Sequence, residues 1–348
     1  MAWTPERFAG MKDMPRLGPD SVTVPGTISG WRALSERFGK LPFAELFEPA
    51  IHYASEGFMV SPTIQRIWAP QEKVLKDQAG WAEAFLPGGR VPQPGELFRF
   101  PDQARTLRLI ADSKGEAFYK GELARKMVAH LRAHGGVMTL EDLATHQCDW
   151  VDTISMGYRG YRLHEIPPNG QGIAAQIALG ILSHFDLASM PVDGAQSEHL
   201  KIEAMKLAFA DVYRYVAQRD AMEVTPEQML DDAYLASRAK LIDPKRAQDF
   251  KAGNPVQGGT IYLTAADENG MMISFIQSNY MGFGSGCVEP TYGISLQNRG
   301  HGFNASPKGA NKANLVAPGK RPFHTIIPAF LTQNGQPVMS FGVMGGNM

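Results

Sequence analysis

The chain is poor in cysteine, has no long apolar run and carries almost no net charge. Only Cys148 and Cys287 occur among 348 residues, too few for a disulfide framework and without the C-x-x-C spacing of a metal site. We expect both to be small buried hydrophobes. The 34 Lys and Arg residues balance 35 Asp and Glu residues, which argues against a nucleic acid or an anionic membrane as partner. The longest apolar run, residues 173–182, is too short to span a membrane.

Motifs for nucleotides and metals are also lacking. The sequence has no Walker P-loop, no G-x-G-x-x-G after a predicted strand and no H-E-x-x-H on a predicted helix. The glycine cluster at residues 282–286 is G-x-G-x-G, which differs from the G-x-S-x-G nucleophile elbow. The nine histidines show no ligand spacing. We therefore predict no cofactor and no metal.

The predicted elements divide the chain into a mostly helical part and a strand-rich part that begins at Thr260. Helices are predicted over residues 116–134, 172–187, 198–218 and 231–241, with a capping box at Thr139 and Asp142. Strands are predicted over residues 158–166, 260–267, 271–278, 294–297, 325–331 and 337–343. Asn-Gly turns at 269–270 and 334–335 indicate hairpins. The polar, Gly-rich joint at 248–259 is expected to be exposed.

Thr260 is the strongest candidate for a catalytic residue. It follows Gly258 and Gly259 and begins the first strand of the strand-rich part. A threonine hydroxyl is a weak nucleophile, but an N-terminal threonine has its own α-amine, with a pKa of about 8, as a base. Thr260 becomes N-terminal only if the chain is cut between Gly259 and Thr260. Gly258 and Gly259 favour such a cut because their backbone lets the Thr260 hydroxyl approach the Gly259 carbonyl closely. On residue chemistry alone, a β-branched residue that merely begins a strand is the alternative.

Blocks of sequence resemble the γ-glutamyltranspeptidase family over nearly the whole chain. Those that resemble the start of its small subunit are residues 260–270, 278–286, 293–298, 318–322 and 342–346. Those that resemble its large subunit are residues 22–26, 38–42, 118–121, 135–143 and 158–168. The resemblance implies an α+β fold, the four-layer αββα sandwich of N-terminal-nucleophile (Ntn) hydrolases, incomplete at both ends.

The resemblance also implies a division into subunits. Residues 1–259 would be the large-subunit portion and residues 260–348 the start of the small subunit, together one layered domain. Autocleavage between Gly259 and Thr260 would release Thr260 as the N-terminal nucleophile. The enzyme would then act on γ-glutamyl or related amides through an acyl-enzyme.

Further site residues follow from the same resemblance. Gly345 and Gly346 match the glycine pair whose backbone N–H groups form the oxyanion hole. Thr264 and Ser278 match hydroxyl positions near the nucleophile, and either hydroxyl could bond the Thr260 amine or hydroxyl. Ser278 stands where the family usually has threonine.

The residues expected on the substrate side depart from the family pattern. Tyr280 stands where glutathione-active members have asparagine, and Asn279 lies one place earlier, on the opposite face of the strand. Arg299 stands where an acidic or amide pair grips the substrate α-ammonium, and His324 and Thr325 replace a serine pair. A cationic Arg299 would repel an α-ammonium. We expect weak glutathione chemistry and an acyl group that is neutral or carries a carboxylate, as in glutaryl-type amides.

Two other classes of function stay open. The first is a non-catalytic relative that keeps the fold as a binding or structural protein, against which the retained Thr260, Gly345 and Gly346 argue. The second is a serine or cysteine hydrolase that uses Ser285 or Cys287 with His324, supported only by proximity in sequence.

The expected partners are a small-molecule amide and a water or amine acceptor. Cleavage would give a heterodimer of large and small subunits, and a higher oligomer stays open. Relative to the family, the chain begins after several helices and an Arg motif and ends soon after Gly346, so it resembles an internal fragment. The compartment is therefore open as well, with the cytoplasm favoured over the periplasm or secretion.

Overall fold

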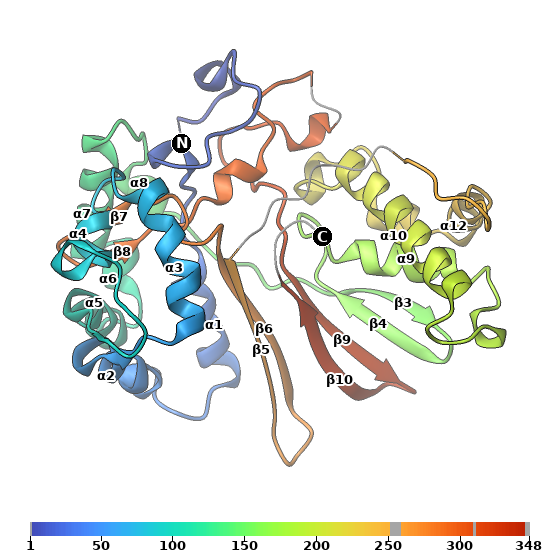
Figure 1. The fold of residues 1–348 in the computed structure, drawn as a ribbon, viewed down its shortest axis with the longest axis horizontal. Helices are drawn as coiled ribbons and strands as arrows, with labels where there is room; N and C mark the ends of the chain where they lie inside the picture. The colour runs from blue at the N-terminus through green and yellow to red at the C-terminus, as the bar shows by residue number, and fades with distance from the viewer. Residues whose placement is uncertain (1, 251–258, 309–310, 345–348) are drawn as a thin grey trace. The chain divides into compact units, whose positions relative to one another are not determined.

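The computed structural model describes residues 2–250, 259–308 and 311–344, so most of the Gly-rich joint lies outside the described residues. The chain divides into two compact units, each formed by segments that are distant in sequence (Figure 1). Unit 1 consists of Met1–Trp3, Pro15–Asp149 and Phe283–Gly300. Unit 2 consists of Thr4–Met14, Trp150–Gly282 and His301–Met348. Thr260 lies within unit 2.

Unit 1 is mostly helical. Its α-helices are α1 (Thr27–Phe38), α2 (Glu48–Glu56), α3 (Pro62–Leu75), α4 (Trp81–Phe85), α5 (Pro101–Asp112), α6 (Glu116–Tyr119), α7 (Glu122–Ala133) and α8 (Leu140–Ala144). Two short strand pairs accompany them, β1 (Phe58–Met59) with β2 (Leu97–Phe98) and β7 (Val288–Glu289) with β8 (Ile294–Ser295). Apolar side chains on one face of α5 and one face of α7 pack into its core, as amphipathic spacing predicts.

The helix predicted over residues 116–134 is divided into α6 and α7. The break lies at Gly121, whose φ of −97° and ψ of −149° are not helical, and a Cβ atom there would collide with the backbone of Ala117. The capping box predicted at Thr139 and Asp142 is confirmed, since each side chain accepts the other's backbone N–H at the start of α8.

The two cysteines differ in exposure. Cys287 is buried, as predicted, but Cys148 is exposed, so the prediction of two buried cysteines is wrong for Cys148. The residues from 147 to 149, at the end of one segment of unit 1, are all exposed, so no apolar layer covers this side chain.

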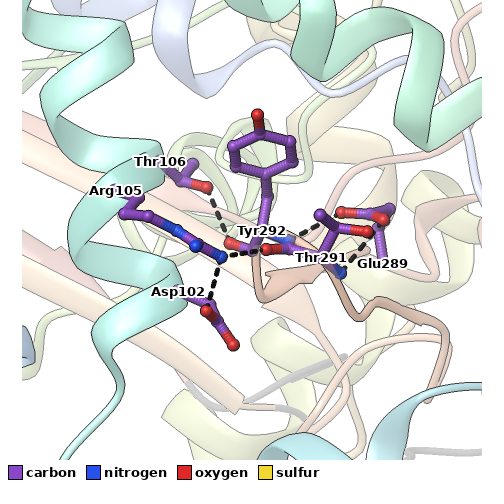
Figure 2. Close-up of polar contacts among 6 residues, drawn as sticks. All are labelled: Asp102, Arg105, Thr106, Glu289, Thr291 and Tyr292. Atoms are coloured by element: carbon purple, nitrogen blue, oxygen red, sulfur yellow. Dashed lines mark hydrogen bonds and ion pairs between the residues drawn. The ribbon is translucent and has the colours of Figure 1, made fainter.

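A set of hydrogen bonds joins the segment after β7 to α5 (Figure 2). The Arg105 guanidinium donates to the Thr291 carbonyl at 2.5 Å, and the buried Thr106 hydroxyl donates to the Tyr292 carbonyl at 2.6 Å. The Glu289 carboxylate accepts the backbone N–H groups of Thr291 and Tyr292 at 3.1 and 2.9 Å. The backbone polar groups of this turn are thus satisfied within unit 1.

Unit 2 is built on an antiparallel sheet of order β10-β9-β4-β3, with helices over it (Figure 1). The strands are β3 (Ile154–Tyr158), β4 (Tyr161–Glu165), β9 (Ile327–Gln333) and β10 (Gln336–Val343). The helices are α9 (Ile173–Leu182), α10 (Ala195–Tyr215), α11 (Pro226–Met229) and α12 (Asp232–Ala239). Helix α9 is apolar nearly all round because the sheet, α10 and α12 all pack against it.

The single strand predicted over residues 158–166 is instead part of a hairpin, β3–β4. The chain reverses at Arg159 and Gly160, which have φ values of 50° and 86°. Gln176 of α9 ties the helix to this hairpin, because its Nε2 donates to the carbonyls of Ile154 and Leu163 at 3.0 and 3.2 Å.

The long hairpin predicted after Thr260 is confirmed as β5 (Gly259–Ala266) paired with β6 (Met272–Tyr280). Asp267 fixes its turn, since Oδ1 accepts the N–H groups of Asn269 and Met271, both at 2.9 Å. Gly270 there has a φ of 83°, which glycine adopts without strain. The second predicted hairpin, β9–β10, is confirmed as well.

Replacing Thr106 by valine should destabilise the protein by about 1–3 kcal/mol, because the Tyr292 carbonyl loses its buried donor. Thr145→Val is the matched control, since Thr145 is exposed and its hydroxyl donates to the carbonyl of Glu141 in the adjacent α8, at 2.7 Å. We expect the control to stay within about 0.5 kcal/mol of wild type. Chemical denaturation measures both, and equal losses would contradict the role given to Thr106.

Candidate active site

Thr260 is the second residue of β5 and is partly buried. The antiparallel register places it opposite Ser278 of β6. The two hydroxyl oxygens are 2.9 Å apart, a hydrogen-bond distance for which either side chain can be the donor. The predicted nucleophile and one of its predicted neighbours are therefore in contact.

A β-bulge lies beside Thr260. Gly259 pairs with Tyr280 and Thr260 pairs with Ser278, so Asn279 is an extra residue in β6. Asn279 is exposed, whereas the Tyr280 side chain is only 5% exposed, so the two point to different environments. Tyr280 has a φ of 75°, and its backbone N–H donates to Ser278 Oγ at 2.8 Å. Ser278 thus contacts both the Tyr280 backbone and Thr260.

The other predicted hydroxyl, Thr264, contacts a different strand. It is exposed on β5, and its Oγ1 makes a short hydrogen bond with Ser340 Oγ of β10. No pattern in the sequence marks Ser340, because its contact depends on how β10 packs against the β5–β6 hairpin. Gly345 and Gly346, the predicted oxyanion pair, lie outside the described residues, so their role stays a prediction.

His324 and Thr325 are fixed through their backbones by the segment after β4. The His324 N–H donates to the Asn169 carbonyl at 2.9 Å, and the His324 carbonyl accepts the Gln171 N–H at 3.0 Å. The Gln171 side-chain amide donates to the Thr325 carbonyl at 2.9 Å. These two predicted substrate-side residues therefore lie in the same unit as Thr260 and are rigidly held there.

Arg299 is buried, with 5% of its surface exposed, and is not a solvated surface arginine. Its backbone N–H makes a short hydrogen bond with Gln297 Oε1. Gln297 in turn donates from Nε2 to the carbonyl and the hydroxyl of Thr23, both at 2.7 Å. Arg299 belongs to unit 1 and Thr260 to unit 2, so a role for Arg299 in substrate binding stays a prediction.

Ser285 and Cys287 lack the features of activated nucleophiles. The buried Ser285 hydroxyl donates to the Leu296 carbonyl at 2.7 Å and accepts the Cys287 N–H at 3.1 Å. Burial raises the pKa of the Cys287 thiol, which disfavours the reactive thiolate. These contacts give no support to the serine or cysteine hydrolase alternative.

The part of the chain that the structure describes has neither a metal-binding cluster nor a membrane-spanning helix. No group of three or more His, Cys, Asp or Glu side chains among residues 2–250, 259–308 and 311–344 is placed to hold a metal ion. In the same ranges, every helix is too short or too polar to cross a membrane.

A buried acid lies beside the segment that holds His324, and the sequence analysis did not predict it. Glu165, the last residue of β4, is 1% exposed, and neither of its carboxyl oxygens has a hydrogen-bond partner among the described residues. Its carboxyl packs on Gly172, where a Cβ atom would collide with it. Burial raises the pKa of Glu165 to about 8. The available signal was strand alternation, which puts Glu165 on the same face as the buried Leu163.

The solved structures show the class of protein. The crystal structure of cephalosporin acylase from Bacillus halodurans matches 99% of this chain with a TM-score of 0.93 and 46% sequence identity, and the chain covers 64% of that structure. The fold is therefore the α+β fold of the Ntn hydrolases, as the sequence resemblance implies.

The family is shown by the sequence. The family model for gamma-glutamyltranspeptidase matches residues 1–348, and the chain belongs to this family. The glutathione hydrolase-like YwrD proenzyme of Bacillus subtilis is 34% identical over 99% of this chain. The oxamate amidohydrolase proenzyme of Klebsiella pneumoniae is 35% identical, also over 99% of this chain. The chain spans 65% of the length of each of these two relatives.

The Glu165 carboxyl should make the protein less stable as the pH rises. Its folded-state pKa of about 8 exceeds the ordinary value of 4.5, so the unfolded chain gives up this proton at lower pH than the folded chain. Its stabilising contribution is complete below pH 4.5 and is lost as the pH approaches 8. The free energy of unfolding should fall by at most about 1.4 kcal/mol per pH unit through this group.

Chemical denaturation at a series of pH values within this window tests the prediction. Glu165→Gln carries no titrating group and should flatten the decline relative to wild type. Glu45→Gln, at an exposed position, is the control and should keep the wild-type slope. Identical slopes for wild type and Glu165→Gln would show that this carboxyl does not control the pH dependence.

Proposed function

We propose that the chain is part of an amidohydrolase or acyltransferase that uses Thr260 as an N-terminal nucleophile after cutting itself between Gly259 and Thr260. The observation that carries the proposal is the position of Thr260 at the start of β5, with its hydroxyl 2.9 Å from that of Ser278. Membership of a family of hydrolases and transferases supports it. The word proenzyme in the names of both sequence relatives supports the self-cleavage.

The proposed cleavage needs only the chain and water. Thr260 Oγ attacks the Gly259 carbonyl carbon, and the C–N bond breaks as an ester to Thr260 Oγ forms. The hydroxyl proton passes to the released Thr260 amine. Water then hydrolyses the ester, which leaves a carboxylate on Gly259 and a free α-amine on Thr260. The hydrogen bond between Ser278 and Thr260 supports this step because it orients the attacking oxygen.

The proposed turnover uses the same oxygen. The Thr260 α-amine, with a pKa of about 8, takes the hydroxyl proton while Oγ attacks the substrate amide carbonyl. The backbone N–H groups of Gly345 and Gly346 hold the tetrahedral oxygen, a contact worth about 3 kcal/mol per donor in other enzymes. The amine leaves with the proton, and water or an amine acceptor releases the acyl group. Residues 1–259 and 260–348 would then belong to the two subunits of a heterodimer.

For the acyl group we propose a neutral chain or one that carries a carboxylate, without the α-ammonium of a γ-glutamyl group. Arg299 supports this choice, because it stands where the family pattern has an acidic or amide pair. The names of two relatives support it as well: one is a cephalosporin acylase, and oxamate is an amide that carries a carboxylate and no ammonium group. A γ-glutamyl substrate is the second candidate, favoured by the family and by the glutathione hydrolase-like relative.

Thr260→Ala removes the attacking oxygen and should abolish cleavage and turnover together. Denaturing mass spectrometry of the full-length wild-type protein should find two pieces divided between Gly259 and Thr260. Thr145→Ala is the matched control, since Thr145 is exposed and lies in unit 1, and it should be cut like wild type. An uncut wild-type chain with full amidase activity would rule out the proposal.

Parallel assays of γ-glutamyl-p-nitroanilide and glutaryl-p-nitroanilide decide between the two acyl groups. The two substrates differ only in the α-ammonium, so their ratio of kcat/KM isolates its effect. We expect the glutaryl substrate to be favoured by about tenfold or more, the size of one like-charge contact. A strong preference for the γ-glutamyl substrate would contradict the proposed acyl group and leave Thr260 as the nucleophile.

A further inference from the structure

The β-bulge beside Thr260 lies directly across the ladder from the peptide bond proposed to break. Gly259 and Thr260 are consecutive in β5, whereas their partners, Tyr280 and Ser278, are separated in β6 by Asn279. From Thr260 to Ala266 the ladder is regular, so the irregularity is confined to this one step. Bulges bend a strand and redirect the side chains next to them.

Tyr280 completes this bulge with an uncommon backbone conformation. Its φ of 75° is in the left-handed region, which non-glycine residues rarely adopt and which is a clear outlier for a bulky one. Such conformations persist only where the surrounding structure imposes them, and they cluster at functional sites. The 5% exposed ring of Tyr280 is packed against the tilted ring of His301, with ring centroids 6.2 Å apart, which helps to hold the residue in place.

The consequence is a hydrogen bond that a regular strand cannot make. In a regular strand, side chains project from the faces of the sheet, while backbone N–H groups lie in its plane. Here the Tyr280 N–H turns back onto the side chain of the residue two places earlier and donates to Ser278 Oγ at 2.8 Å. The same oxygen is 2.9 Å from Thr260 Oγ1. The bulge therefore connects the backbone of Tyr280 to the proposed nucleophile through one hydroxyl.

We propose that Tyr280 is a positioning residue that acts through its backbone. Its left-handed conformation aims its N–H at Ser278 and so holds the Ser278 hydroxyl on Thr260 for cleavage and turnover. The inference rests on the function proposed for Thr260. The asparagine that the family pattern has at this position is compatible with the same backbone conformation, because asparagine adopts the left-handed region more readily than most other non-glycine residues.

Substitutions that differ in backbone preference test the inference in the full-length protein. Valine, which is β-branched, strongly disfavours the left-handed region, whereas glycine and asparagine accept it. Tyr280→Val should slow self-cleavage by about tenfold or more, the size expected for one strained backbone residue. Tyr280→Gly and Tyr280→Asn should keep most of the wild-type rate of self-cleavage, although both remove the ring. Phe275→Val replaces a ring elsewhere in β6 and is the matched control.

If the side chain of Tyr280 were the important group, valine, glycine and asparagine would all slow cleavage alike, and that result would overturn the inference. Circular dichroism and thermal melting identify any variant that has lost its fold.

A double-mutant cycle with Ser278→Ala gives a second readout that a general loss of stability would not produce. If Tyr280 acts through Ser278, Tyr280→Val should have little further effect on cleavage in the Ser278→Ala background. Fully additive effects would overturn the inference even if the single variants behave as expected. Failure of the proposed function looks different: in that case wild type is not cut at Gly259, or Thr260→Ala is still cut.

Discussion

The pairing of β5 with β6 is the constraint on which the geometry at Thr260 depends. The two strands are joined by a short turn that Asp267 closes through the N–H groups of Asn269 and Met271. Turn geometry fixes the register of a hairpin, and a slip of one residue would move every side chain to the other face. The turn at one end of the hairpin therefore determines which hydroxyl meets Thr260 at the other end. The bulge at Asn279 then shifts the strand pairing by one residue between Thr260 and Gly259.

Local sequence signals predicted the β5–β6 and β9–β10 hairpins and the helices α9, α10 and α12, and they failed where the fold uses residues without such signals. The β9–β10 turn has Asn334 and Gly335, a pair that favours positive φ. The β3–β4 turn instead places Arg159 at positive φ, which no sequence rule favours, so the hairpin was predicted as one strand. The break between α6 and α7 lies at Gly121, whose backbone is not helical, and apolar periodicity alone does not show it.

The contacts of the candidate site were predictable only in part. The register of one hairpin brings Thr260 and Ser278 together, so their contact follows from local pairing. The contact of Thr264 with Ser340 joins two different hairpins and could not be foreseen from either one. Glu165 contradicts the general rule that acids are exposed or paired, so its place on the same face of β4 as Leu163 was the one signal for its burial.

The sheet of unit 2 combines strands from both sides of Thr260 in the sequence. Strands β3 and β4 precede this residue, whereas β9 and β10 follow it. A chain cut at Thr260 would thus keep its two products joined by the β4–β9 ladder and by the backbone bonds at His324. Before the cut, refolding of this sheet is a unimolecular event. Afterwards the two products must first meet, so recovery from denaturation becomes dependent on protein concentration. The intact precursor would then be the form in which the sheet assembles most readily, and the lifetime of a cut form would be set by how slowly it unfolds.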